Sequence, residues 1–300
     1  MSTRAATCIG CIAIVLWSLL ALLTTATGNV PPFLLVAFSF SIGGTLGLGY
    51  LACTPRGLRS LGEIPLGAWA LGVAGLFGYH ALYFLALRSA PALQANLINN
   101  LWPLLIVLFS ALLPARDRTG GLKWWHLAGA FLGLSGTVLI VSGGDGARAM
   151  QGEGNIPWLG YGAALAAALV WSGYSVANRR FTTVPSTSVA GFCVATALLA
   201  VGAHLAFEET IWPAGPVEWA AVAGLGLGPV GAAFYVWDHG VKHGDLRVLG
   251  AAAYAIPVLS TLALVAFGQS TAGPALWAAC ILITAGAVLA ARALLFGARD

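Results

Sequence analysis

The pattern of hydrophobic and polar positions divides the chain into long apolar runs that are separated by short polar ones. A helix that spans a bilayer needs about 20 mostly apolar residues. Breaking the chain at charges and at Pro/Gly-rich clusters leaves ten runs of about this size, at residues 7–26, 33–53, 66–87, 91–113, 123–142, 157–178, 187–207, 217–238, 247–267 and 275–296. The pattern therefore predicts an all-α integral membrane protein with ten transmembrane helices.

The chain also contains an internal repeat. Sliding the sequence on itself by 154 residues aligns Trp17 with Trp171, Ser18 with Ser172, Phe38 with Phe192, Arg88 with Lys242, and Pro103 with Pro257. Each half, residues 1–150 and residues 151–300, then holds five predicted helices, and because five is odd the halves must enter the membrane in opposite orientations. We expect two inverted five-helix repeats, which are typical of transporters whose substrate binds near mid-membrane at the repeat interface. The repeat also assigns the first helix to the mature fold and not to a signal peptide.

Composition and charge agree with a membrane protein and indicate its orientation. Hydrophobic residues make up 59% of the chain and charged residues 8%, whereas about 25% of the residues of a soluble domain are charged. With ten helices, the side that holds both termini carries twelve Lys and Arg, and the other side carries only Arg88 and Arg148. Basic residues are retained in the cytoplasm, so we predict cytoplasmic N- and C-termini. This bias accounts for the net charge of +4, and we expect no nucleic-acid partner.

Polar and aromatic residues occur inside several of the predicted spans, where no water satisfies them. Tyr79, His80 and Tyr83 adjoin on one face of the third helix, and an Asn-rich face follows on the fourth. One reading is structural, since hydrogen bonds between membrane helices are worth about 0.6 kcal/mol on average. Two facing polar clusters favour a shared cavity instead. The residues that we expect to line it are Trp17, Tyr79, His80, Tyr83, Asn99, Asn100, Trp102, Trp171, Tyr174 and Tyr254.

The ionisable residues limit the chemistry of such a cavity. Acidic residues lie in predicted loops or at helix ends, and Asp238, at the end of the eighth helix, comes nearest to the membrane. His80 lies near mid-membrane, where an ionisable residue is a functional hypothesis, and we expect it to act as a neutral hydrogen-bond partner. A lining of Trp, Tyr and Asn suits small zwitterionic or amphipathic molecules, and its lack of a carboxylate predicts transport without proton coupling. Pro103 and Pro257 each remove a backbone donor within an apolar helix and are the expected hinges.

Two short motifs carry little functional information. Cys8 and Cys11 form a C-x-x-C at the start of an apolar helix, without the strand–turn–helix context of a redox site. His239 and His243 are four residues apart in "DHGVKHGD", which reads as a loop because it contains two glycines. We therefore expect no metal site and no cofactor.

Longer segments carry a resemblance to a known family. "ALVWSGYSVANRR" is similar to the start of the second repeat of the drug/metabolite transporter superfamily, in its EamA-type branch, and "ALRSAPALQANLINNLWPLLIVLFSALL" is similar to the hairpin of its third and fourth helices. The resemblance covers nearly the whole chain. The segments "GYHALYFLAL" and "NLINNLWPL" are most similar to the aromatic amino acid exporters of that branch. The resemblance implies export of amino acids, especially aromatic and neutral ones, across a bacterial inner membrane by alternating access.

The chain departs from the general family pattern at charged positions. Phe38 stands where many members have an Arg in the second helix, and "LLPARD" and "FGQST" lack the Glu that many members have near the ends of the fourth and ninth helices. A charge-coupled mechanism therefore cannot be carried over from those members.

Other function classes require features that the sequence does not show. A broader exporter of drugs or cationic metabolites would need a buried acid facing the cavity. An intramembrane enzyme would need a nucleophile with a base or a metal cluster; Ser18, Ser172 and His80 are present, but without a G-x-S-x-G or H-E-x-x-H motif. A structural scaffold does not explain a polar lining in an inverted repeat. The expected partners are an amino acid substrate and the lipid bilayer, and the oligomeric state stays open, with a monomer compatible.

Overall fold

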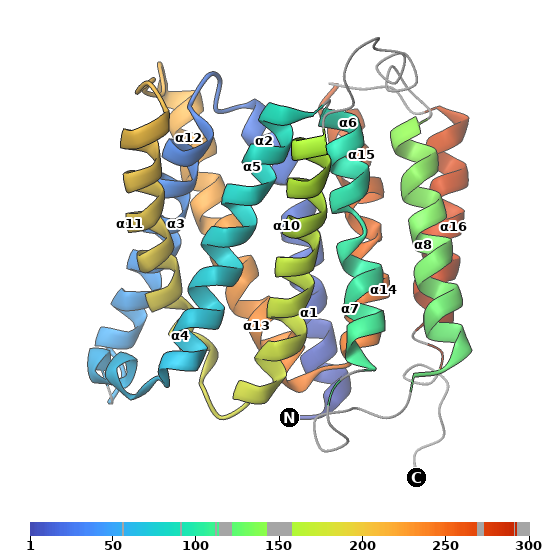
Figure 1. Ribbon diagram of the computed structural model, residues 1–300, viewed down its shortest axis with the longest axis horizontal. Coiled ribbons are helices and arrows are strands. Elements are labelled where there is room, and N and C mark those ends of the chain that lie inside the picture. The colour runs from blue at the N-terminus through green and yellow to red at the C-terminus, as the bar shows by residue number, and fades with distance from the viewer. Residues whose placement is uncertain are drawn as a thin grey trace.

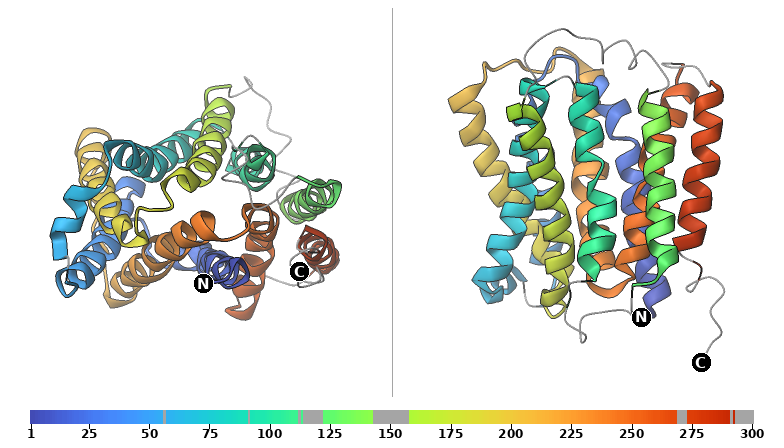
Figure 2. Two further views of the ribbon diagram at one scale, coloured as in Figure 1. Left: turned by 90° about the horizontal axis from the view of Figure 1, so that it is seen from below. Right: turned by 45° about the vertical axis from the view of Figure 1, so that its right-hand side comes forward.

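The computed structural model describes residues 1–55, 57–90, 92–111, 113, 122–142, 158–268, 273–290 and 292. All regular secondary structure in these residues is helical, and the helices stand side by side in one bundle (Figure 1). The first helix begins and the last helix ends at the same end of the bundle (Figures 1 and 2). We call this the inner end and the opposite end the outer end.

The helices occupy the ranges that the apolar runs predict, although several ranges are divided into two pieces. In chain order the α-helices are α1 (Thr3–Ser18), α2 (Leu20–Thr25), α3 (Pro32–Ala52), α4 (Leu66–Val73), α5 (Tyr79–Ser89), α6 (Ala92–Asn99), α7 (Trp102–Ser110), α8 (Trp124–Ser142), α10 (Trp158–Ala177), α11 (Val189–Phe207), α12 (Pro216–Leu227), α13 (Ala233–His243), α14 (Leu246–Ala253), α15 (Ala255–Ala266) and α16 (Pro274–Ala290). Short 3₁₀ segments are η1 (Gly57–Glu63), η4 (Asn178–Phe181) and η5 (Ser186–Ser188), and η2 (Ala74–Gly78) and η6 (Gly228–Ala232) are π-helical turns.

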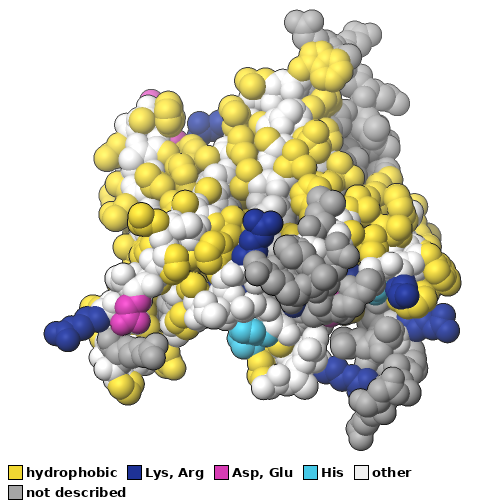
Figure 3. Space-filling model, turned by 60° about the horizontal axis from the view of Figure 1, so that its bottom comes forward, with side chains coloured by type: hydrophobic (Ala, Val, Ile, Leu, Met, Phe, Trp, Pro, Cys, Tyr) yellow, Lys and Arg dark blue, Asp and Glu magenta, His cyan; other side chains and the backbone are white. Residues whose placement is uncertain are grey.

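Six helical segments of the described residues are long and apolar enough to cross a membrane. They are Thr3–Thr25, Pro32–Ala52, Leu66–Ser89, Trp158–Phe181, Ser186–Phe207 and Pro216–His243, and shorter apolar helices cover Leu246–Ser260 and Trp277–Ala290. Hydrophobic side chains cover much of the flank of the bundle (Figure 3). These observations confirm the all-helical membrane class.

One predicted boundary is wrong. The sequence predicts a helix that ends at Asp238 and a loop over "DHGVKHGD", but α13 continues to His243 and α14 begins at Leu246. Gly240 serves packing and not a turn, because a Cβ atom there would lie 2.5 Å from the Cα atom of Gly10 on α1. An i,i+4 ion pair between Asp238 and Lys242, 2.8 Å long, also stabilises this part of the helix.

The helices that contain Pro103 and Pro257 are both interrupted near the proline. α6 ends at Asn99 and α7 starts at Trp102, while α14 ends at Ala253 and α15 starts at Ala255. The backbone N–H of Leu104 donates to the hydroxyl of Tyr254 over 3.2 Å. The two interruptions are thus joined by a buried hydrogen bond.

The packing of the helices follows a recurring scheme. α1 packs along α13 and α5 packs along α10, while α3 pairs with α11 and α8 pairs with α16. The π-helical turns recur as well, because η6 begins 154 residues after η2 and has the same length. π-Helical turns are rare and are frequent at functional sites.

Candidate functional site

A cluster of aromatic rings joins helices that are distant in the sequence. The ring centroid of Trp17 on α1 lies 6.4 Å from that of Trp102 on α7, 5.6 Å from that of Trp171 on α10 and 5.0 Å from that of Trp237 on α13. Trp102 and Trp171 meet edge to face at 6.3 Å and 88°, a geometry that aromatic quadrupoles favour. The ring of Phe234 also contacts Trp17, at 5.9 Å. We call these five residues the aromatic cluster.

Hydrogen bonds fix the orientation of the indoles. Nε1 of Trp17 donates to the carbonyl of Pro229 in η6 over 2.9 Å, and Nε1 of Trp237 donates to Oγ of Ser175 over 3.1 Å. Oγ of Ser172 lies 3.0 Å from the carbonyl oxygen of Trp102, across the α10–α7 contact. Both bonded indole nitrogens are therefore satisfied by protein.

Tyr and Asn side chains border the aromatic cluster. The ring of Tyr79 lies 5.5 Å from that of Trp171, and its hydroxyl accepts a hydrogen bond from Nδ2 of Asn99 over 3.1 Å. Tyr83 stacks on Tyr79 at 5.8 Å and donates to Oδ1 of Asn96 over 3.2 Å. The other amide atom of Asn99, Oδ1, is buried and has no hydrogen-bond partner among the described residues. A buried acceptor without a partner is costly, so this oxygen is available to an N–H donor.

Tyr174 extends the same surface. Its ring lies 5.3 Å from that of Trp171. Its hydroxyl is buried and, within the described part of the chain, has no hydrogen-bond partner. An O–H group can donate to a carboxylate, so this hydroxyl is a free donor at the border of the aromatic cluster.

His80 sits at the edge of this group among aromatic rings. Its ring is edge-on to Phe40 at 5.2 Å and lies 6.3 Å from Phe234. Nδ1 lies 2.7 Å from the carbonyl oxygen of Leu76. Because a carbonyl only accepts, Nδ1 carries the proton, and Nε2 of a neutral ring is then an acceptor.

Two predicted site residues lie apart from the aromatic cluster. Tyr254 is packed among Leu104, Val107 and Ala130 in a second core cluster, and its hydroxyl is taken by the N–H of Leu104. Asn100 lies in the turn between α6 and α7. The structure brings together Trp17, Tyr79, Trp102, Trp171 and Tyr174, with His80, Tyr83 and Asn99 at the edge.

The sequence reasoning missed Phe234 and Trp237. The signal that could have found them is the 154-residue shift, which aligns Phe234 with His80 and Trp237 with Tyr83. His80 and Tyr83 were already predicted to line the cavity, so the shift marks Phe234 and Trp237 as candidates as well.

The buried carboxylates carry basic partners. Asp238 is fully buried and pairs with Lys242 at 2.8 Å. Glu208 pairs with Arg88 at 2.9 Å and also accepts hydrogen bonds from the backbone N–H groups of Phe33 and Leu34 at the start of α3. Neither carboxylate is left as an unpaired charge.

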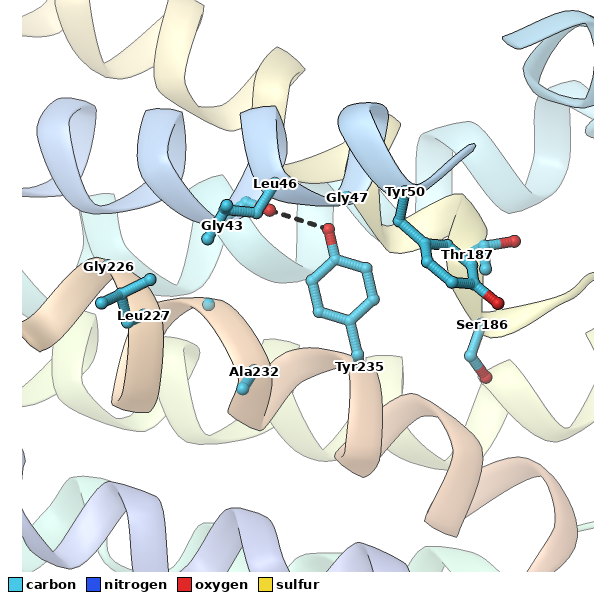
Figure 4. Close-up of a pocket in the computed structure, with 11 residues that line it drawn as sticks. Gly43, Leu46, Gly47, Tyr50, Ser186, Thr187, Gly226, Leu227, Ala232 and Tyr235 are labelled. Carbon is cyan, nitrogen blue, oxygen red and sulfur yellow. Dashed lines mark hydrogen bonds between the residues drawn. The ribbon is translucent and has the colours of Figure 1, made fainter. Parts of the chain in front are cut away.

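A cavity of about 420 Å³ lies away from the aromatic cluster, between α3, η5 and the α12–η6–α13 segment (Figure 4). Tyr235 crosses it and donates to the carbonyl of Gly43 over 2.9 Å. Leu46 and Tyr50, which line it, are exposed, so the cavity reaches the surface beside them. Within the described part of the chain, no charged side chain and none of the predicted site residues line it. It therefore does not suit a zwitterionic ligand.

Comparisons with known proteins agree with the membrane fold. Residues 4–142 and 158–292 each match the EamA-like transporter family. The chain is 52% identical over 292 residues to the aromatic amino acid exporter YddG of Ancylobacter novellus, covering 97% of this chain and 98% of that protein. It is 25% identical over 302 residues to the aromatic amino acid exporter YddG of Escherichia coli, covering 96% and 97%. A solved crystal structure with 50% identity superposes with a TM-score of 0.89, covering 96% of this chain and 98% of that one. These matches confirm the resemblance seen in the sequence.

Proposed function

The chain belongs to the EamA-like transporter family, and on this basis we propose that it exports aromatic and other neutral amino acids across a bacterial inner membrane. The observation that carries the proposal is the aromatic cluster with Asn99 and Tyr174 at its border. The relatives that are named aromatic amino acid exporters match nearly the full length of the chain.

We further propose that the chain crosses the bilayer ten times as two inverted repeats, residues 1–150 and residues 151–300. Three observations support this arrangement. The family matches the chain twice, once in each half. The contact of α1 with α13 has its counterpart in the contact of α10 with α5, as expected when a two-fold axis exchanges the halves. Finally, the π-helical turns η2 and η6 stand at equivalent positions.

The inner end is proposed to face the cytoplasm. Among the described residues, the exposed basic side chains of Arg4, Arg59, Lys123 and Arg180 lie at elements that begin or end there, whereas Arg88 is exposed at the outer end. Blue side chains surround the inner end where it comes forward in Figure 3. Basic residues are retained on the cytoplasmic side, so the exposed cations support cytoplasmic termini.

The substrate is proposed to bind against the aromatic cluster. An aromatic side chain would take up ring contacts with Trp171 and Trp102, each worth about 0.5–1.5 kcal/mol beyond the area buried. The ammonium group would donate to Oδ1 of Asn99, and the hydroxyl of Tyr174 would donate to the carboxylate. These two polar contacts accept any amino acid backbone, while the rings select aromatic side chains.

Transport is proposed to be uncoupled from protons. The buried carboxylates of Asp238, Asp245 and Glu208 each pair with a basic side chain, and inverted halves can exchange inward- and outward-open shapes by rocking. The interruptions near Pro103 and Pro257 are the proposed hinges. The substrate gradient then sets the direction of net flow.

The test is flux in liposomes that contain the purified protein. Phe and Trp should show counterflow and net flux down their gradients, without accumulation when only a pH gradient is applied. Trp171→Ala should reduce Trp flux by at least about tenfold, since it removes two or more ring contacts. Leu198→Ala, at an exposed position on the flank, is the matched control and should transport normally. Equal transport of unrelated cationic drugs would favour a broader exporter, and proton-driven accumulation that His80→Ala abolishes would refute uncoupled transport.

A further inference from the structure

The two ends of the bundle differ at positions that the 154-residue shift makes equivalent. At the inner end α13 packs against η4, the continuation of α10. The equivalent pair at the outer end is α5 and α2, and among the described residues these helices show no comparable packing. The contact between α13 and η4 therefore closes the inner end, and no comparable contact between α5 and α2 closes the outer end within the described residues.

Hydrogen bonds hold the inner contact together. Nδ2 of Asn178 on η4 donates to Oδ1 of Asp238 on α13 over 2.6 Å. NH1 of Arg179 donates to the carbonyls of Val241 and Gly244 at the end of α13, over 3.1 and 2.6 Å. Lys242 donates to the carbonyl of Val184, which precedes η5, over 3.0 Å. We call Asn178, Arg179, Asp238 and Lys242 the inner latch.

The outer end cannot form the same bonds. The shift places Thr24 and Thr25 at the positions of Asn178 and Arg179, and Phe84 and Arg88 at the positions of Asp238 and Lys242. All four residues of the inner latch are buried, whereas Thr24, Thr25 and Arg88 are exposed and Phe84 is half-buried. Of the four latch residues, only Lys242 has a counterpart of the same charge, Arg88. Arg88 pairs with Glu208, which follows the end of α11 and does not belong to α2.

We propose that the inner latch is a gate that biases the resting protein toward the state that is closed at the inner end and open at the outer end. This inference rests on the proposed transport function and deepens it. Two inverted halves of identical sequence would favour neither state. The hydrogen bonds between η4 and α13 have no counterpart between α2 and α5 among the described residues, so they shift the population toward inner closure. Residues of the latch act as positioning residues, since they set which state offers the aromatic cluster to solvent.

The arrangement of charge in the latch allows the gate to open. Asp238 and Lys242 lie four residues apart on α13, so their ion pair moves with that helix. Separating η4 from α13 therefore breaks the bonds of Asn178 and Arg179 but does not leave Asp238 as an isolated buried charge, which would be far more costly. The gate is strong enough to bias the resting state and weak enough to open in each cycle.

Thiol accessibility tests the proposal without any substrate. Ser175 is fully buried between Asn178 and the aromatic cluster and accepts a bond from Trp237. Ser175→Cys, in a protein whose native cysteines at 8, 11, 53, 193 and 280 are replaced, reports inner opening through its reaction with a membrane-impermeant maleimide. The reagent is applied separately to inside-out and right-side-out vesicles. The equivalent outer position is Ala21, which is exposed, and Ala21→Cys reports outer opening.

Asn178→Leu should increase the labelling rate of the inner reporter by at least about tenfold, because a hydrogen bond to a charged group is lost. Labelling of the outer reporter should decrease. The nearly isosteric Asn178→Asp places a second carboxylate opposite Asp238 and should have the same effect. It replaces Asn178→Leu as the test variant if the Asn178→Leu protein does not accumulate in the membrane. The double variant Asn178→Asp/Asp238→Asn again pairs an amide with a carboxylate, keeps one negative charge in the latch with Lys242, and should return labelling toward the parent rate. Ser110→Ala, which removes a buried hydroxyl bonded within α7, is the control and should change nothing.

Parent-like labelling of the inner reporter in both single variants would overturn the proposal. Fast labelling that the double variant does not reverse would also overturn it, because the cause would then be general loosening and not this bond. A protein that shows the labelling response but no amino acid flux in liposomes would retain the gate and refute the proposed substrate instead.

Discussion

The contact between Gly10 and Gly240 predicts a stability effect whose size can be worked out from the structure. A Cβ atom on Gly240 would lie 2.5 Å from Cα of Gly10 and 3.1 Å from its backbone nitrogen. Carbon atoms prefer separations of about 3.5–4.0 Å, so Gly240→Ala forces α1 and α13 apart by about 1 Å. Both atoms belong to backbone, and no side chain can rotate away. Overpacking of this kind costs about 1–3 kcal/mol.

A second glycine isolates this cost from the helix propensity of alanine. Replacing a helical Gly by Ala is worth about 0.5–1 kcal/mol in itself. Gly202 on α11 has no atom within 4 Å of an added Cβ, so Gly202→Ala gains the propensity without the clash. The difference between the two variants therefore measures the clash alone.

The assay is the thermal unfolding midpoint of both variants in the same detergent. The midpoint of Gly240→Ala should lie below that of Gly202→Ala by at least about 2 °C, since 1 kcal/mol corresponds to about 2–4 °C in chains of 150–250 residues. Equal midpoints, or a higher midpoint for Gly240→Ala, would refute the close approach of α1 and α13. Gly10→Ala should lower the midpoint by less, because its Cβ atom would lie 3.0 Å from Cα of Gly240 and its nearest contact, at 2.8 Å, is the side chain of Leu249.

Three further variants probe other buried groups. Tyr254→Phe leaves the N–H of Leu104 without its acceptor, and we expect a loss of about 0.6–3 kcal/mol in thermal unfolding with unchanged affinity for Trp, because Tyr254 lies outside the aromatic cluster. Asp238→Asn leaves Lys242 as an unpaired buried charge and should cost about 3–5 kcal/mol, whereas Asp238→Asn/Lys242→Met should recover most of the loss; similar midpoints for the two variants would contradict this. Glu208→Gln weakens the cap of α3 and the pair with Arg88, whose side chain is 47% exposed, so the midpoint should fall, and the difference from the parent should narrow at high salt. A difference that does not change with salt would assign the effect to the cap alone.

Much of the fold follows from local sequence patterns, and the exceptions have physical causes. Apolar runs predict the helices because a bilayer imposes both length and composition, and Pro103 and Pro257 predict where two of them are interrupted. The sequence predicts the wrong end for α13 because a glycine can mark either a turn or a close contact between two membrane helices. Gly240 and its neighbours look like a turn until Gly10 is placed against them, and no local pattern reveals that contact.

The aromatic cluster, which is our candidate site, could be predicted only in part. Trp17, Trp102 and Trp171 stand out because large polar aromatics are rare inside apolar runs, and the structure brings them together. Tyr254 has the same appearance in the sequence, yet its hydroxyl is used by Leu104. Whether a buried hydroxyl is available to a ligand depends on a partner 150 residues away, which the sequence does not specify.

The two π-helical turns also bear on the history of the chain. A π-helical turn contains one residue more than the α-helical turn it replaces, so inserting one residue into an α-helix is one way to create it. η2 and η6 stand 154 residues apart, at the same position of each half. Under the proposed repeat, a single insertion in an ancestral five-helix unit, followed by duplication of that unit, accounts for both turns. The halves have since diverged around this shared irregularity: the carbonyl of Pro229 in η6 accepts the indole N–H of Trp17, whereas Gly75 in η2 packs against the ring of Tyr174.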